Sequence, residues 1–506
     1  MSIKTFAALA ALAPIIAARP SHTPDNTTSW IELPGSIITE QWGYCPAASW
    51  PQSEEGSRII PPKPDEELQR MLAEVSQDRI GRIISTLASF GTRHTLSQQN
   101  SSTRGIGAAR DWIYNEMQSY RDGSDMEVYF DSYIQTEASR IPFPVNMTNV
   151  VARINGTEDA NRTYVVTGHY DSRKLDIMDY TGDAPGADDD ASGVAVVMEL
   201  ARVVASMGRP KATMIFAATA GEEQGLYGAT HLAEVLKNAS VNVEGNWNND
   251  IVGTGKNDPF DEINDYTIRL FGASVFYPNY TGVAALERRY AIIGGWNDSP
   301  AQQLGRYIAE VAAGAADWIG MQVKLVYRPD RYLRGGDHQG FLEQGFPAVR
   351  FTEAFEEFKH QHQDVREEDG VQYGDLVEFV DFDYTARVAR TNLATIWSAA
   401  NAPGMPQNVS ISYDVGTTAA DDDAPLLVMS NKSRLFWNTG DDPLVEHYEV
   451  VYRPSGSLQW THAVDVGTSG NVTLELSKDN FQLGVRAVGA DGKKSPAVFP
   501  LPIAGL

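Results

Sequence analysis

The sequences TYVVTGHYDS, residues 163–172, and ATMIFAATAGEEQG, residues 212–225, decide the fold of this 506-residue chain. Each begins as a short apolar run of β-type residues and ends in glycine and polar or charged side chains. Similar runs, NVVARI at 149–154 and FPAVRF at 346–351, accompany a helical pattern at 194–207. This alternation is typical of an α/β fold, in which a mostly parallel mixed sheet is flanked by helices.

Histidine and acidic residues follow the predicted strands. His169 comes directly after the first run, Glu222 and Glu223 follow the second, and Asp250 ends another predicted strand. Open α/β sheets bind ligands beyond the carboxyl ends of their strands. We therefore expect these side chains to lie close together at one edge of the sheet.

Two more local sequences complete a set of metal ligands: GADDDASG at 186–193 and FKHQHQD at 358–364. Zinc takes imidazole nitrogen and carboxylate oxygen as ligands. Two histidines and three acids can serve two zinc ions only if one carboxylate is shared. The predicted ligands are His169, Asp189, Glu223, Asp250 and His360. The residues alone leave open which aspartate is shared.

These local sequences, in this order over roughly residues 80–400, closely resemble the secreted co-catalytic di-zinc aminopeptidases, which are glutamate carboxypeptidase-like zinc exopeptidases. The resemblance implies the zinc exopeptidase fold and two Zn²⁺ per chain, with Asp189 as the bridging ligand. It assigns His169 and Asp250 to one zinc, and Glu223 and His360 to the other.

The resemblance also implies roles for two further acids. A hydroxide bridging the two zinc ions would attack the peptide bond, and Glu222 would act as the general base that passes a proton to the leaving amine. Asp171, two positions after His169, would orient a ligand imidazole and raise its basicity.

Two histidines are candidates for the second histidine ligand. FKHQHQD offers both His360 and His362. The family's usual spacing, a histidine followed four positions later by an acid, selects His360 with Asp364. His362 is then expected to be a pocket or surface residue.

The segment 327–353 resembles the part of the family that carries an Asp-His pair near the site. Tyr332 is expected to donate a hydrogen bond to the tetrahedral oxyanion, and Arg331 or Arg334 to meet a substrate carboxylate. Contact of either arginine with glycans, water or Glu353 is an equal alternative. The candidates for substrate contact are Arg331, Tyr332, Arg334, Asp337 and His338.

The amino end predicts secretion. Residues 1–18 form a signal peptide with an apolar run too short to span a membrane. Asn-x-Ser/Thr sites, which predict N-linked glycans, lie at Asn26, Asn100, Asn146, Asn155, Asn161, Asn238, Asn279, Asn297, Asn408, Asn431 and Asn471. A single Cys45 excludes an internal disulfide, and a net charge of -25 argues against nucleic-acid and membrane partners.

The chain divides into segments of different composition. Residues 19–75 are predicted to be an N-terminal extended segment or a propeptide, and residues 76–402 the di-zinc peptidase domain. A Pro- and Gly-containing linker at 401–406 precedes an all-β domain at 407–506, which resembles a fibronectin type III sandwich. This C-terminal domain is a candidate for extracellular or cell-wall contact.

These features together predict a secreted zinc-dependent exopeptidase that removes residues from the amino end of peptides. A carboxypeptidase or dipeptidase of the same superfamily would use identical metals, so the ligands do not separate these activities. A receptor-like homologue without activity is the alternative from another class. Such a protein would be expected to lose ligands or the base, which this chain retains.

Overall fold

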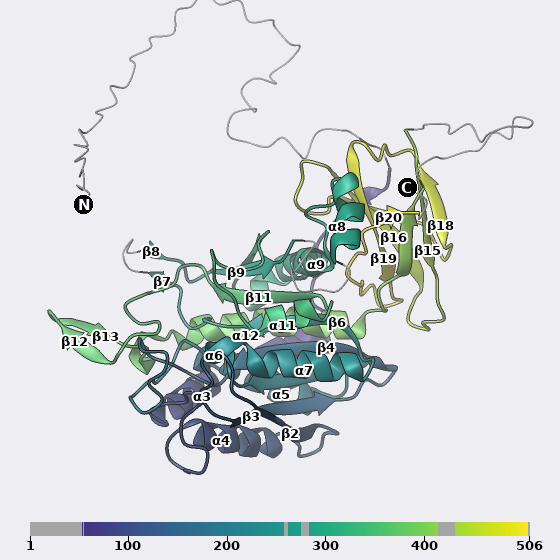
Figure 1. Cartoon of the computed structure of the whole chain (residues 1–506). Coiled ribbons are helices and arrows are strands. Elements are labelled where there is room, and N and C mark those ends of the chain that lie inside the picture. Colours follow the sequence, from purple (N-terminus) through teal and green to yellow (C-terminus); the bar gives the residue numbers. More distant parts are fainter. Residues whose placement is uncertain (1–52, 54, 258–261, 275–282, 413–430, 504–506) are drawn as a thin grey trace, which may run out of the picture. The chain divides into compact units, whose positions relative to one another are not determined.

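The computed structural model describes residues 53, 55–257, 262–274, 283–412 and 431–503 (Figure 1). The predicted signal peptide lies outside the described residues, as do most of the segment that follows it and the glycosylation sites at Asn26 and Asn279.

A mixed eight-stranded sheet forms the centre of the peptidase domain. In order across the sheet its strands are β10 (Gln322–Val326), β9 (Thr267–Gly272), β11 (Ala348–Glu353), β6 (Asn242–Asn249), β4 (Asp159–His169), β5 (Ala212–Thr219), β3 (Val145–Ile154) and β2 (Glu127–Gln135). The central strands β11, β6, β4 and β5 are parallel to one another, whereas β2 and β3 pair antiparallel. The predicted α/β fold with a mostly parallel mixed sheet is confirmed.

Helices cover both faces of this sheet (Figure 1). One face carries α3 (Gln77–Ser89), α4 (Ile106–Ser119), α5 (Ala191–Met207), α9 (Pro300–Gly314) and α12 (Phe382–Asn401). The other carries α7 (Tyr227–Asn238) and α11 (His338–Glu343). Successive residues of β4 alternate between these faces, so Tyr164 and Val166 join the first core and Val165 the second.

Helix α5 positions the site because its first turn follows the acidic loop. The Asp190 side chain accepts a hydrogen bond from the Gly193 amide and so caps the helix. Nearly every later side chain of α5 is buried, which is typical of a helix packed between a sheet and other helices. Burying one of its valines stabilises the fold by about 1.5–3 kcal/mol. Because the helix is held in the core in this way, the loop that precedes it has a fixed end.

Helix α2 (Glu66–Glu74) lies within residues 19–75, which are predicted to be an extended segment or a propeptide. Asp65 caps it, and Leu68, Met71 and Leu72 are buried in the core that α5 and α12 share. The predicted extended segment 19–75 therefore ends in a helix that is part of the peptidase core. The sequence signal was the helical pattern after Pro64, which the boundary at residue 76 ignored.

Short elements connect the larger ones. They are α6 (Glu222–Gly225), β7 (Lys256–Asn257), β8 (Glu262–Ile263), α8 (Val283–Ile292), α10 (Ala316–Ile319), β12 (Arg366–Glu368), β13 (Val371–Tyr373) and the 3₁₀ turn η1 (Val377–Phe379). No helix among the described ranges is long and apolar enough to cross a membrane.

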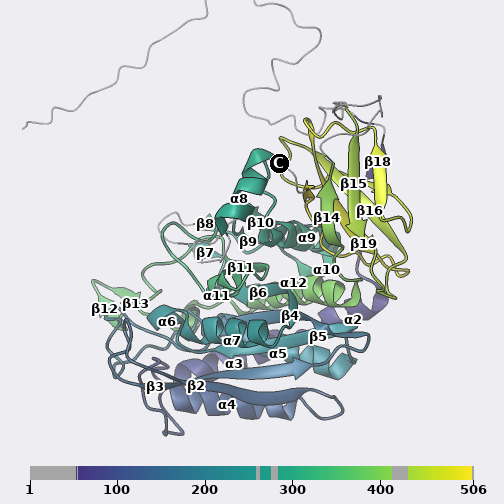
Figure 2. The same ribbon diagram turned by 45° about the vertical axis from the view of Figure 1, so that its right-hand side comes forward.

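The C-terminal residues, together with the short N-terminal strand β1, form two four-stranded sheets (Figure 2). One has the order β1 (Ser57–Arg58), β17 (His462–Asp465), β16 (His447–Pro454), β19 (Phe481–Val488). The other has the order β18 (Asn471–Leu474), β15 (Ser433–Asn438), β14 (Gln407–Ile411), β20 (Leu501–Pro502). Side chains of both sheets, among them Trp437 and Val485, share one core, as in a sandwich. Its likeness to fibronectin type III stays a prediction.

Candidate metal centre and active site

Most residues of the candidate site lie just beyond the carboxyl ends of four neighbouring strands. His169 is the last residue of β4, and Asp250 directly follows β6. Glu222 and Glu223 open α6 just after β5, and the loop that carries His362 follows β11. Because these strands are parallel, their carboxyl ends lie side by side, and the side chains converge as expected.

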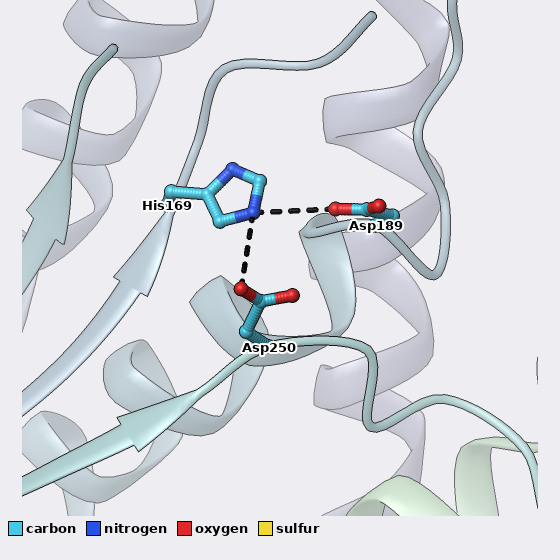
Figure 3. A group of neighbouring side chains, drawn as sticks. All are labelled: His169, Asp189 and Asp250. Carbon is cyan, nitrogen blue, oxygen red and sulfur yellow. Dashed lines mark ion pairs between the residues drawn. The ribbon is translucent and has the colours of Figure 1, made fainter. Parts of the chain in front are cut away.

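His169, Asp189 and Asp250 form the first group of potential ligands. Figure 3 shows the three side chains pointing toward one another. His169 Nε2 lies 3.2 Å from Asp189 Oδ1 and 3.7 Å from Asp250 Oδ2. The three ligand atoms lie within 4.8 Å of one another, and all three residues are buried. This arrangement offers one nitrogen and two oxygens to a single point.

Asp189 also belongs to a second group, with Glu223 and His362. Its Oδ2 atom lies 2.7 Å from His362 Nε2, which lies 3.1 Å from Glu223 Oε1. The two oxygens of Asp189 thus face different groups. This is the geometry that a carboxylate shared by two metal ions requires.

The structure corrects the choice between the two histidines. His360 stacks on Phe379, with ring centroids 3.7 Å apart, and it belongs to neither ligand group. Burial lowers the pKa of His360 to about 4. His362 reaches the cluster from a backbone with φ of 58°, a left-handed conformation that turns the chain. The structure therefore groups His362, and not His360, with the potential ligands, and the spacing that selected His360 does not detect this turn.

Asp171 contacts a residue of each ligand group: His169 of the first and Glu223 of the second. Its carboxylate accepts hydrogen bonds from the Glu222 and Glu223 amides, at 3.2 and 3.1 Å, and from Thr95 Oγ1 at 3.0 Å. Its Oδ1 atom lies 3.6 Å from His169 Nδ1, which faces the backbone oxygen of Asp171 at 3.1 Å. The predicted orienting residue is therefore placed beside the imidazole, and it also holds the turn that carries both glutamates.

Arginines support two ligands, and the sequence analysis missed this role. Buried Arg350 contacts Asp250 Oδ1 through Nη2 at 2.8 Å and Asp330 Oδ2 through Nη1 at 3.2 Å. Arg173 donates to Glu223 Oε2 at 2.8 Å and also reaches His362 Nδ1. Each arginine holds one oxygen of a ligand carboxylate and leaves the other facing the cluster.

Asp375 fixes the acidic loop from a distant part of the chain. Its two carboxylate oxygens accept hydrogen bonds from the amides of Asp188 and Asp189, each at 2.8 Å. Asp190 in the same loop accepts one from the His169 amide at 3.0 Å. The loop is thus connected to both β4 and the segment before α12, which sets the direction of the Asp189 side chain.

A cavity of about 350 Å³ opens onto both ligand groups, and Glu222 lines it. Burial, opposed by His169 and reinforced by Asp250 and Glu223, raises the pKa of Glu222 well above its usual value. A cation bound nearby would lower that pKa again. A carboxylate whose proton affinity is set by its surroundings, next to a metal centre, is suited to general-base work.

The predicted substrate contacts divide into two classes. Arg331 and Arg334 line the cavity, as expected. Tyr332 is 74% exposed, lies under Arg328 and is not among the residues that line the cavity. Asp337 and His338 are fully buried around the start of α11, where they contact Thr219 Oγ1 and the Pro329 carbonyl, and neither lines the cavity. The structure thus places these three residues outside the cavity lining.

The donor atoms fit metal binding. His169 Nε2 and Glu223 Oε1 are buried, and each lacks a well-formed hydrogen bond to any other described group. Burial lowers the pKa of His169, but the carboxylates of Asp171, Asp189 and Asp250 outweigh it and raise that pKa well above its usual value. Buried like charges without compensation are costly, and cations relieve that cost.

Comparison with known proteins gives consistent results. Residues 149–380 match the model of peptidase family M28. A probable zinc metalloprotease of Pyrenophora teres f. teres is 53% identical over 93% of this chain and 94% of its own length. One from Leptosphaeria maculans is 55% identical over 88% of this chain and 100% of its own.

A solved structure, the LapA aminopeptidase of Legionella pneumophila, is 19% identical and covers 69% of this chain and 78% of its own, with a TM-score of 0.46. The identity to the two fungal relatives over nearly the whole chain decides the family. This chain belongs to peptidase family M28, a family of hydrolases, and is an enzyme of that family.

Proposed function

We propose that the protein is a zinc-dependent aminopeptidase that holds two zinc ions and removes residues from the amino end of peptides. The binding of two ions is supported by the position of the Asp189 carboxylate between the two ligand groups. Its Oδ1 faces His169, and its Oδ2 faces His362. Peptide hydrolysis is the chemistry of the family, and zinc is the metal named for its fungal relatives. The amino-end direction rests on the resemblance of the local sequences to di-zinc aminopeptidases.

The potential ligands form two groups, one for each zinc ion. His169, Asp189 and Asp250 would hold one ion, and Asp189, Glu223 and His362 the other. When bound, such a pair acts as a Lewis acid toward the substrate carbonyl and makes water a stronger nucleophile. Neither group has a fourth protein ligand among the residues described, which leaves room for water and substrate.

Glu222 is the proton carrier in this proposal. Its carboxylate lines the cavity beside both ligand groups but belongs to neither. It takes a proton from the attacking water and delivers it to the nitrogen of the leaving amine. Asp171 holds the Glu222 amide, and Arg350 and Arg173 hold the ligands, so the base and the reacting centre keep a fixed separation.

A carboxypeptidase or dipeptidase is the second candidate, and one observation favours it. Each of the four acids that line the cavity is either a potential metal ligand or the base, so none of these four is left to bind a substrate amine. Four arginines line the same cavity and could bind a substrate carboxylate. An amino-end enzyme needs an anionic partner for the substrate amine, and a carboxyl-end enzyme needs a cationic partner for the terminal carboxylate.

We also propose secretion, with N-linked glycans on the surface. Among the described glycosylation sites, the exposed asparagines are Asn100, Asn146, Asn161, Asn238, Asn297, Asn408, Asn431 and Asn471. Asn155 is half-buried. Exposed sites are accessible to the glycosylation machinery of the secretory pathway, and they support the signal-peptide prediction. Contact of the C-terminal domain with a cell wall stays a prediction.

The direction of cleavage is tested with one peptide in two forms. We expect the protein to shorten a peptide with a free amino end and to leave the same peptide intact when that end is acetylated. Chelation should abolish the cleavage, and added zinc should restore it. Mass spectrometry of the products identifies the end that is lost. Loss of C-terminal residues from both forms would replace the aminopeptidase by the second candidate.

A further inference from the structure

Guanidinium groups surround the cavity over the metal centre. Its lining includes Arg140, Arg173, Arg331 and Arg334. The larger apolar side chains of the described lining are Leu226 and Ile251. The chain as a whole carries a net charge of -25, so this cluster of cations is local.

Two of these arginines, Arg331 and Arg173, contact groups of the protein through all three side-chain nitrogens. Arg331 uses Nε on Asp330 at 2.9 Å, Nη1 on Glu356 at 3.1 Å and Nη2 on the Gly335 carbonyl at 2.8 Å. Arg173 is occupied by Glu223 and His362. Both therefore act as positioning residues, and of the two arginines expected to meet a substrate carboxylate, Arg334 stays the candidate.

Arg334 and Arg140 keep donors for a ligand. The side chain of Arg334 is 31% exposed and contacts Glu356 through Nη1. Glu356 is already paired with Arg331 and, at 3.2 Å, with Arg269, so Arg334 adds a positive charge that this carboxylate does not cancel. Arg140 is exposed and donates one hydrogen bond from Nη1 to the Glu223 carbonyl, a neutral group, at 3.1 Å.

The acids of the cavity do not neutralise these two arginines. Asp189, Glu223 and Asp250 belong to the ligand groups, and Glu222 is the base. Bound metal ions compensate the charge of their own ligands. The positive charge of Arg334 and Arg140 then faces the space in which the substrate lies.

We propose that the cavity binds a carboxylate of the substrate through Arg334 and Arg140. The proposal rests on the proposed function, since it names the substrate class of the same site. Guanidinium is the side chain that best matches a planar carboxylate, by two parallel hydrogen bonds. Two sources share this chemistry: the acidic side chain of an amino-terminal Glu or Asp, and the carboxylate at the end of a short peptide.

Two pairs of substrates separate these sources. Glutamyl and glutaminyl p-nitroanilides differ in a side-chain carboxylate and have no terminal one. The dipeptide Gln-Ala and its amide differ in the terminal carboxylate alone. With the zinc-loaded full-length protein, we expect kcat/KM to favour the carboxylate member of one pair by about 10- to 100-fold, the effect of a charged hydrogen-bonded pair.

Variants connect that preference to the arginines. Arg334→Gln should reduce the preference to less than about one third of its wild-type value, and Arg334→Lys should retain part of it, because lysine supplies the charge without the fork. Arg328→Gln is the matched control, because Arg328 is an exposed arginine of the same segment that does not line the cavity. Arg334→Gln should fold, since Glu356 keeps Arg331 and Arg269.

Each outcome decides one point. A preference within the anilide pair supports binding of an acidic side chain, and one within the dipeptide pair supports binding of the terminal carboxylate and overturns the amino-end direction. Equal turnover within both pairs overturns the carboxylate site but leaves the zinc peptidase intact. A preference that survives Arg334→Gln and Arg140→Gln overturns the assignment to these residues.

If no substrate is turned over, the proposed function fails. Ligand binding can still test whether the cavity holds a carboxylate. The probes are then glutarate and glutaramide, measured by calorimetry with Glu222→Gln. Binding of glutarate that is at least about tenfold tighter, and that is weakened when Arg334→Gln is added, supports the site. Equal binding of the two compounds overturns it.

Discussion

Glu222→Gln is expected to lower kcat by at least about 100- to 10,000-fold, the contribution of a positioned general base. Glutamine has the size of glutamate but cannot accept a proton. Because Glu222 belongs to neither ligand group, the variant should keep its zinc content and its fold. Zinc analysis, circular dichroism and single-turnover kinetics on the same preparation test all three expectations.

Glu357→Gln is a suitable control for that experiment. Glu357 lies in the loop after β11 and does not line the cavity over the metal centre. We expect it to keep most of the activity. A Glu222→Gln variant that retained more than about one tenth of the wild-type kcat would contradict the assignment of the base.

His362→Ala is expected to remove one of two zinc ions and to lower activity by more than about 100-fold. His362 supplies the nitrogen of the second ligand group, and losing only a partner that orients a ligand already costs about 10- to 100-fold in metal affinity or activity. The first group, His169, Asp189 and Asp250, is intact in this variant. Zinc analysis should therefore give close to half of the wild-type metal.

His360→Ala is the matched control, two positions away in the same loop. It removes the stacking on Phe379, which is worth about 0.5–1.5 kcal/mol, so we expect a small loss in the free energy of unfolding and normal zinc content. Urea unfolding and zinc analysis measure both. The opposite pattern, with metal lost from His360→Ala and kept in His362→Ala, would restore the ligand that the spacing rule selected.

The residues at strand ends could be predicted from the sequence because local pattern determines them. His169 and Glu223 each follow a short apolar run, Asp250 follows another predicted strand, and these segments form parallel strands of this sheet. Asp189 precedes a helix whose cap, Asp190, is visible in the sequence. Parallel strands then bring the four side chains to the same edge.

The remaining parts of the site depend on tertiary structure. Arg350 lies within β11, and its role depends on the contact with Asp250, 100 positions earlier. Asp375 reaches the amides of Asp188 and Asp189 across an even longer separation in sequence. His362 depends on a left-handed backbone residue, which a spacing rule does not detect. The resemblance of the segment around Tyr332 does not fix the direction of its side chain, which is exposed to solvent.

Anomalous diffraction from zinc-loaded crystals at the zinc absorption edge tests the central claim most directly. We predict two peaks about 3.5–4 Å apart, on either side of the Asp189 carboxylate, one beside His169 and Asp250 and the other beside Glu223 and His362. A single peak, or a peak at His360 in place of His362, would contradict the two-metal site.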